Sequence, residues 1–423
     1  MLAGVAYGKS QRSVKDEDAF ACQVAKQAAC FGVFDSHGGK EAGRRCAAEL
    51  APNLLTLGGA DDAVGHAAFP KDSIVTAFWD MDHDLGSHGV YSGTTASVLL
   101  VAPLVAPAGD ALLEARSHAK LTENSAGADA TAGGDMLCCT LAWVGDSTAL
   151  TLEMGGSERT PEFWQTSNHT PTNPQEVHRC ELEWRARQLL QAGALDAVGG
   201  GSHVDSFRLI ADSGASFYAR RQAPTQEQVV QAAQSLGVLM SEEETALLVR
   251  ALRREKRIEA PERRQSFLTT GKPKLTRADT SMIARVSEVD PSVHGPTVLA
   301  AGERSSVSTC VTRSIGDWDA SRAMVPHPDV HRFEVRGANW VRVIIASDGV
   351  WDFVTDREAA TLARRCEKAQ DAATKLVDLA YRRSMRRLER LKDDTTALVV
   401  DLNPSASPFQ PPTATPGGCC MVM

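Results

Sequence analysis

The sequence predicts an α+β domain built in layers, and two observations carry this prediction. Short apolar runs typical of strands recur in the first and the last part of the chain, with helical stretches between them. Several of these runs end in an acidic turn, as "FGVFD" does at residues 31–35 and "VRVIIASDG" at residues 341–349. Strand runs separated by helices are typical of a layered α+β arrangement.

The individual elements follow in order along the chain. The strands are indicated by β-branched and aromatic residues, and they are expected at residues 31–35, 94–101, 138–146, 341–349 and 395–402. Apolar residues at three- and four-residue spacing predict one helix over residues 40–55. A second helix is expected over residues 357–390.

These patterns divide the chain into four regions. Residues 1–180 and 306–402 carry the strands and are assigned to one domain. Residues 181–305 interrupt it as an insertion of helical character. Residues 403–423 are rich in Pro, Ser and Thr, so a disordered tail is expected there. A surface loop is expected at residues 109–135, which are rich in Ala and Gly.

Composition sets the broad class. The chain has 423 residues, 43% hydrophobic and 23% charged, as is usual for a soluble globular protein. Its net charge of −8 argues against nucleic acid as a partner. The longest apolar run, residues 96–108, is too short to span a bilayer, and we expect no signal peptide. Ten cysteines without a CxxC pair argue against zinc. Except at the C-terminus, we expect them to be reduced thiols of a cytoplasmic protein. We also expect a monomer.

Carboxylates are concentrated at predicted strand ends and turns. In chain order they are Glu17, Asp18, Asp35, Asp146, Asp348, Asp352, Asp393 and Asp394. Each one alone is more often a cap or turn residue, but carboxylates that meet in a cleft repel each other unless divalent cations neutralise them. Mg²⁺ or Mn²⁺ suits such oxygen ligands best. Two ions about 4 Å apart would activate water for attack on phosphorus, in a phosphate monoesterase or a phosphodiesterase.

Eight short motifs then identify a family. They are "DEDAF", "FGVFDSHGG", "YSGTTASVLLV", "AWVGDSTAL", "NHTP", "TRSIGDWDA", "IIASDGVWDFV" and "DDTTALVV". In this order they resemble the metal-dependent serine/threonine protein phosphatases of type 2C, over most of residues 4–180 and 306–402. The resemblance implies a β-sandwich of two antiparallel sheets flanked by helices, with the metals in a cleft at one end. It implies hydrolysis of phosphoserine and phosphothreonine on proteins by a metal-bridging hydroxide; the alternative is a pseudophosphatase that binds phosphorylated partners without turnover.

The resemblance also implies which residues hold the metals. The ligands of two Mg²⁺ or Mn²⁺ ions would be Asp35, Ser36 through its carbonyl, Asp348 and Asp393, with Asp35 bridging both ions. A third, looser ion would lie at Asp146, Asp348 and Asp352.

Three further residues take roles around these ions by the same resemblance. Glu17 and Asp18 would order metal-bound water. His37 would be the general acid that protonates the departing serine or threonine oxygen.

The chain departs from the family pattern at three places. Ser36 stands where the family has Gly, which leaves a carbonyl ligand in place provided that the backbone does not need a positive φ. The phosphate-binding arginine would be Arg12, but it lies six residues before Asp18 where the family has five. A bulge could restore its reach, or Lys15 could replace it as a point charge. Thr148 stands where an arginine is common.

The insertion at residues 181–305 lies where the family carries its flap, a small element beside the active site. Two amphipathic helices are expected in it, at residues 225–237 and 241–257. We expect an enlarged flap that selects substrates or gates access; the alternative is an insertion remote from the cleft. Ser266 follows two arginines in "RRQSF", which resembles a site for basophilic kinases.

The sequence ends in "CCMVM", which matches a prenylation pattern. Cys420 would carry a farnesyl group, and Cys419 would be a second acylation site. One lipid chain gives only reversible binding, and residues 403–418 contain no Lys or Arg to help it. We therefore expect two lipid chains and peripheral attachment to the cytosolic face of a membrane.

Overall fold

The computed structural model describes most of the predicted catalytic regions and little of the insertion. The described ranges are 4–57, 69–104, 136–154, 162–176, 179, 230, 242, 246, 283–286, 296–298, 310–318, 324–337 and 339–404. The predicted loop at 109–135, Ser266, Cys419 and Cys420 lie outside them. Of the two predicted insertion helices, only Val230, Glu242 and Ala246 are described, each as helical.

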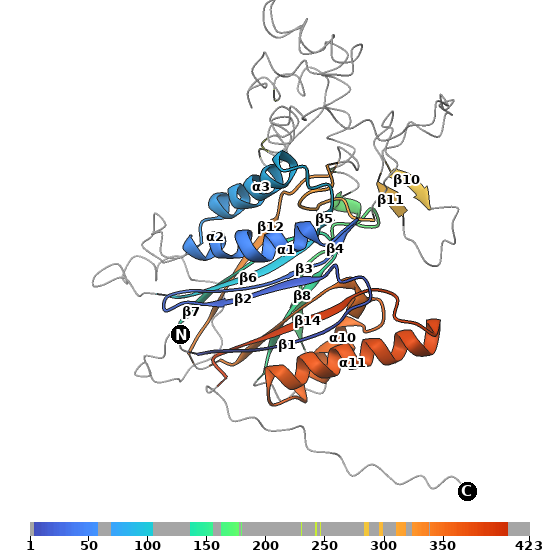
Figure 1. Ribbon diagram of the computed structural model, residues 1–423. Helices are drawn as coiled ribbons and strands as arrows, with labels where there is room; N and C mark the ends of the chain where they lie inside the picture. Colours follow the sequence, from blue (N-terminus) through green and yellow to red (C-terminus); the bar gives the residue numbers. More distant parts are fainter. Residues whose placement is uncertain are drawn as a thin grey trace, which may run out of the picture.

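Two five-stranded antiparallel sheets face each other in the middle of the molecule (Figure 1). The first sheet has the strand order β1 (Val5–Arg12), β14 (Thr395–Leu402), β13 (Val341–Ala346), β8 (Thr148–Glu153) and β9 (Phe163–Gln165). The second has the order β12 (Asp329–Val335), β7 (Leu137–Val144), β6 (Ala96–Pro103), β3 (Ala29–Phe34) and β2 (Ala19–Val24). The predicted sandwich is therefore confirmed.

The central strands are buried on both faces. Phe31 and Leu99 of the second sheet pack against Ile345 and Leu398 of the first, in the core between the sheets. The alternate residues of the same strands, such as Phe34, point to the outer face and pack against helices. Because both faces are covered, these strands are continuous apolar runs in the sequence, which made them predictable.

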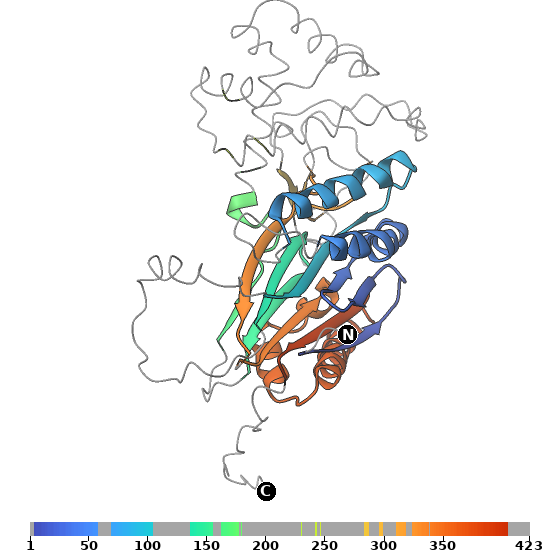
Figure 2. The same cartoon turned by 90° about the vertical axis from the view of Figure 1, so that its left-hand side faces the viewer.

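Helices form the two outer layers (Figures 1 and 2). The second sheet is covered by α1 (Glu41–Arg45), a π-helical segment (Cys46–Leu50), α2 (Ala51–Thr56) and α3 (Lys71–Ser87). The first sheet is covered by α9 (Asp348–Trp351), α10 (Asp356–Arg364) and α11 (Ala369–Leu388). Among the described residues, no helix is long and apolar enough to cross a membrane.

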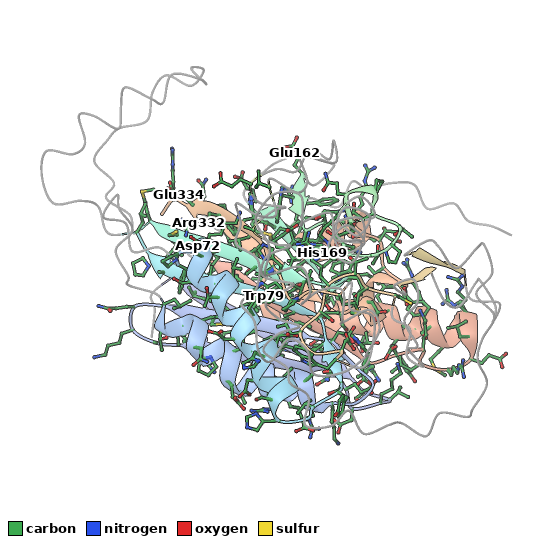
Figure 3. All side chains as sticks on the ribbon, turned by 90° about the horizontal axis from the view of Figure 1, so that it is seen from above. Asp72, Trp79, Glu162, His169, Arg332 and Glu334 are labelled. Carbon is green, nitrogen blue, oxygen red and sulfur yellow. The ribbon has the colours of Figure 1, made fainter. Side chains whose placement is uncertain are left out.

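Helix α3 is joined to β12 by two hydrogen bonds, one just before the helix begins and one from its middle. Arg332 of β12 donates to the carbonyl of Phe69, just before α3 begins, and the Trp79 indole donates to His327, just before β12, at 3.3 Å. Figure 3 labels Trp79 on the helix and Arg332 on the strand.

One helix predicted over residues 357–390 is wrong, because the structure has two. Helix α10 begins with a capping box of Thr355 and Glu358 and ends at Arg364, and α11 begins at Ala369. The reason lies in β13. Arg342, whose side chain is fully buried, donates to the carbonyls of Ala363 and Cys366 at 2.6 and 2.8 Å and so binds the end of α10.

A buried ionic cluster joins the two segments that flank the insertion. Glu176 accepts from Arg313 at 2.5 Å and from the Thr312 hydroxyl at 2.6 Å, and Arg179 donates to the Thr312 carbonyl at 3.0 Å. Burial disfavours the charged carboxylate, but the two arginines hold the pKa of Glu176 well below 4.5. His169, labelled in Figure 3, is 1% exposed beside this cluster. The chain therefore leaves for the insertion and returns from it at one fixed place.

The ion pair of Arg342 with Asp401 gives a stability prediction. The pair is buried in the first sheet, with N–O distances of 2.6 and 2.8 Å. Arg342→Met leaves the Asp401 charge and the carbonyls of α10 without a partner, so we expect a loss of about 3–5 kcal/mol in the free energy of unfolding. Adding Asp401→Leu should restore part of it. Urea denaturation measures both values.

The matched control is Arg12→Met. Arg12 pairs with Asp378 at 2.8 Å, but both side chains are more than 40% exposed. Removing an exposed pair costs at most about 1 kcal/mol. Equal losses for the two arginine variants would contradict the role given to burial.

Candidate active site

Strand register brings acidic residues from both sheets to one end of the sandwich. Ala19 pairs with Phe34, so Asp18 and Asp35, the residues that adjoin this pair, come together. In the other sheet, Ala346 pairs with both Ala397 and Thr148. Asp348 follows β13 by two residues, so it lies beside the segments that precede β14 and β8. Within each sheet, residues predicted from separate motifs are thus brought together by hydrogen-bonded pairing.

The acidic side chains lie close enough to raise one another's pKa. Burial, followed by the negative charges of Asp348, Asp18 and Asp146, raises the pKa of Asp35 well above 3.8. Burial and the charges of Asp146, Asp352 and Asp393 do the same to Asp348. Such carboxylates resist ionisation together unless positive charge is added.

Part of that positive charge comes from two lysines at the rim. Lys15 Nζ lies 2.7 Å from Asp393 Oδ2 and 4.0 Å from Glu17. Lys392 pairs with Asp352. Burial would lower the pKa of both ammonium groups, but the neighbouring carboxylates raise it. Among the described residues, neither lysine makes an ion pair with Asp35 or Asp348, which share the centre of the cluster.

A divalent cation fits this donor set. The donors are oxygens, their charges repel one another, and one carboxylate oxygen, Asp18 Oδ1, is buried without a hydrogen-bond partner among the described residues. Within the same ranges, no three His, Cys, Asp or Glu side chains form a ready-made coordination sphere. A hard ion that keeps several water ligands suits such a loose set.

The loop that carries Glu17 and Asp18 is held by Asp394, which the motif analysis left without a role. Its two oxygens accept from the backbone N–H groups of Val14, Lys15, Glu17 and Asp18 at 2.5–3.2 Å. Burial opposes its ionisation, but these four donors hold the pKa of Asp394 at about 2. The loop is therefore bound to the start of β14. A carboxylate that adjoins a predicted ligand was the only signal for it in the sequence.

His37 lies at the same end, paired with a carboxylate that sequence reasoning also missed. Its Nε2 is 2.7 Å from Oδ2 of Asp317. Burial would lower the pKa of His37, but the charge and the hydrogen bond of Asp317 raise it above 6.5. Asp317 belongs to the quoted motif "TRSIGDWDA", which could have pointed to it.

The Asp317 carboxylate is closely confined. It is 3% exposed and accepts from the Ser314 hydroxyl at 2.5 Å. Its backbone has a φ of +56°, and a Cβ placed on Gly93 would lie 2.1 Å from its carboxyl carbon. The left-handed backbone of Asp317 and the missing side chain of Gly93 thus let the Asp317 carboxylate reach the His37 ring.

Ser36 keeps the backbone that the predicted metal ligand needs. It lies in the short strand β4 (Ser36–His37), paired with β5 (Gly93–Thr94), and does not have a positive φ. Its hydroxyl accepts from the Gly43 N–H at 3.0 Å. A Cβ on Gly43 would lie 2.1 Å from that hydroxyl oxygen, so Ser36 is accommodated by a glycine in α1.

Arg12 and Thr148 are directed to other partners. Arg12 Nη2 contacts Asp378 of α11 at 2.8 Å, and its guanidinium lies 4.2 Å from the ring centre of Tyr381. Thr148 donates to the Asn168 side chain at 2.9 Å. Of the two residues considered for phosphate, Lys15 contacts the acidic site residues, whereas Arg12 contacts α11.

Comparisons with known proteins agree on one family. The family model "Protein phosphatase 2C" matches residues 284–387. A probable protein phosphatase 2C of rice (Oryza sativa subsp. japonica) is 43% identical over 107 residues, and one of Arabidopsis thaliana is 43% identical over 96 residues. These matches cover 25% and 23% of this chain and 23% and 21% of the relatives, so the chain spans less than a quarter of their length.

One solved structure aligns with most of the chain at low sequence identity. The serine-threonine phosphatase 2C from Toxoplasma gondii aligns with 95% of this chain and 96% of its own, at a TM-score of 0.49 and 13% sequence identity.

The contact between Ser36 and Gly43 gives a double-mutant prediction. Gly43→Ala forces the new Cβ against the Ser36 hydroxyl, so we expect a loss of about 1–3 kcal/mol in the free energy of unfolding. Ser36→Gly removes that oxygen, and the next atoms from the Cβ are at 3.3 and 3.4 Å. The double variant should therefore be more stable than Gly43→Ala alone. Additive losses in chemical denaturation would contradict this pairing.

Proposed function

Because residues 284–387 match the protein phosphatase 2C family model and curated relatives are similar over about a quarter of the chain, we propose that the chain belongs to this family and hydrolyses phosphoserine and phosphothreonine on proteins. One observation carries the proposal: Asp35, Asp146 and Asp348 interact at one end of the sandwich. His37 lies at the same end with its pKa raised, so an acid is present beside the acidic cluster. Oxygen donors together with a proton donor suit cleavage of a phosphate monoester.

The acidic residues would hold Mg²⁺ or Mn²⁺. We assign two ions to Asp35, the Ser36 carbonyl, Asp348 and Asp393, and a third to Asp146 with Asp352. When bound, such ions neutralise the carboxylates and supply an activated water for attack at phosphorus. The loop bound by Asp394 keeps Glu17 and Asp18 beside Asp35, where they can orient water.

His37 would donate the proton to the departing oxygen. Asp317 accepts from its Nε2 side and raises the pKa of the ring above 6.5, which favours the imidazolium form that can donate a proton. About a third of the His37 side chain is exposed, which leaves it accessible to a substrate oxygen.

Metal removal and three variants test the proposal. Hydrolysis of a phosphothreonine peptide should require Mg²⁺ or Mn²⁺ and stop in excess chelator. Asp35→Asn and Asp348→Asn should each lose most activity, and His37→Gln should lose about 10²–10⁴-fold in kcat. Phosphate release measures all of these. The control is Asp371→Asn on the exposed start of α11, which should behave as wild type.

Full activity in chelator would refute the metal assignment. Binding of phosphopeptide without any phosphate release by the wild-type protein would instead indicate a pseudophosphatase.

Lys15 is our candidate for binding the substrate phosphate. Its side chain is 46% exposed while its ammonium contacts Asp393, whereas Arg12 is engaged by α11. Lys15→Gln should therefore raise KM by about tenfold or more, because a charged contact to phosphate contributes about 1.5–3 kcal/mol. Arg12→Gln should leave KM near the wild-type value. The reverse order of effects in steady-state kinetics would return the role to Arg12.

Two further proposals concern residues beyond the described ranges. Residues 181–305 would form the enlarged flap, and deleting 224–270 should change kinetics on intact phosphoproteins. Cys420 and Cys419 would be lipidated, attaching the protein to the cytosolic face of a membrane. Intact-mass measurement of the natural protein tests this: an unmodified C-terminus would refute it.

A further inference from the structure

A pocket of about 260 Å³ lies between the C-terminal turns of α11 and the residues that follow α9. Asp352 and Phe353 form one wall, and Arg383, Arg386 and Arg387 form the other. We call it the arginine pocket.

The three arginines lie on one face of α11, because residues three and four apart are neighbours on a helix. Arg383 is already engaged: it donates to the Phe353 carbonyl at 2.7 Å and pairs with Glu358 at 2.7 Å. Arg386 and Arg387 are exposed and make no ion pair with any residue the structure describes. The pocket therefore has one arginine held by the fold and two that are available to an anion.

A structural explanation for these arginines accounts for only part of the arrangement. Cations in the last turn of a helix stabilise its C-terminal carbonyls by about 0.3–1 kcal/mol. This stabilisation is the same whichever part of the protein the last turn of the helix contacts. Here the turn adjoins Phe353 and Asp352 across a concave surface.

Asp352 belongs both to the arginine pocket and to the acidic cluster. It forms part of the pocket wall and pairs with Lys392. Its charge also acts on Asp146 and Asp348. The pocket thus opens beside the place where the scissile phosphate would bind.

We propose that the arginine pocket binds a second anionic group of the substrate, a phosphate or a carboxylate near the scissile phosphoresidue in the same peptide. The inference rests on the proposed phosphatase function and extends it to a substrate class, phosphopeptides with an anionic flank. Arg386 and Arg387 supply forks that match phosphate and carboxylate oxygens. Arg383 keeps the wall in place through Glu358 and the Phe353 carbonyl.

The test uses the full chain and a set of phosphothreonine peptides that differ only in one flanking residue. That residue is phosphoserine, Glu or Ala, placed at several positions on either side. Wild type should have a lower KM for a phosphoserine or Glu flank than for Ala, by about tenfold for the best position, as expected for a charge-assisted contact. Added salt should reduce the difference. The two anionic arms show whether phosphate or carboxylate is preferred.

The variant pair is Arg386→Gln with Arg387→Gln, and the matched control is Arg382→Gln, an exposed arginine of α11 outside the pocket. The double variant should lose the preference for anionic flanks and keep its KM for the Ala peptide. The control should retain the preference. A denaturation midpoint equal to that of wild type shows that folding is unchanged, and Arg387→Lys, which keeps the charge, should retain part of the preference.

Equal loss on all peptides, or no flank preference in wild type, would overturn the proposal. So would loss of binding to phosphatidylserine vesicles in the double variant with the peptide preference intact, which would assign the arginines to a membrane. Binding is also measured by fluorescence anisotropy with unhydrolysed peptides in chelator. If wild type never releases phosphate but still prefers anionic flanks, the pocket stands and the proposed hydrolysis fails.

Discussion

Repulsion between carboxylates is the constraint on which the site depends. Register in the two sheets brings Asp35 and Asp348 together at one end of the sandwich, and both have a pKa raised by burial and by neighbouring charge. A buried anion is costly unless it is paired or hydrogen-bonded. The strands that place these residues are fully buried, so the backbone has little freedom to relieve the repulsion. The divalent cations of the proposed function would balance this charge.

The polar groups around the central carboxylates have different partners and different roles. Asp394 is satisfied by backbone N–H groups and serves to hold the loop, which is why its pKa is low while that of Asp35 is high. Lys15 and Lys392 take up charge at the rim, on Asp393 and Asp352. The central carboxylates are left with the donor set that suits a hard cation. Similar side chains thus take different roles because their partners differ.

Sequence patterns predicted most of the fold and only the local part of the site. The strand at residues 395–402 was predicted to the residue because it is rich in apolar and β-branched residues, as buried strands are. The break between α10 and α11 was missed because its cause, Arg342, lies on a strand and reaches the helix end only in the folded molecule.

The same limit applies to the contacts of His37 and Arg12. Asp317 is 280 residues from His37 along the chain, and it reaches the ring through a left-handed turn that no pattern specifies. Spacing within a motif suggested Arg12 for phosphate, but spacing does not reveal that Asp378 and Tyr381 of α11 compete for its guanidinium. Motifs identify which residues carry chemistry, whereas partners that are distant in the sequence decide where those side chains point and how they are charged.

An anionic phosphopeptide has to approach a site that is itself acidic. The chain has a net charge of −8, and the carboxylates alone would repel a phosphate. The lysines at Asp393 and Asp352 and the arginines of α11 place positive charge around the acidic centre. A phosphopeptide that approaches from this side meets cations before it meets carboxylates. Under the proposed function, this arrangement would let one end of the sandwich hold divalent ions at its centre and attract phosphate at its rim, since each group of charges acts most strongly on the ligand nearest to it.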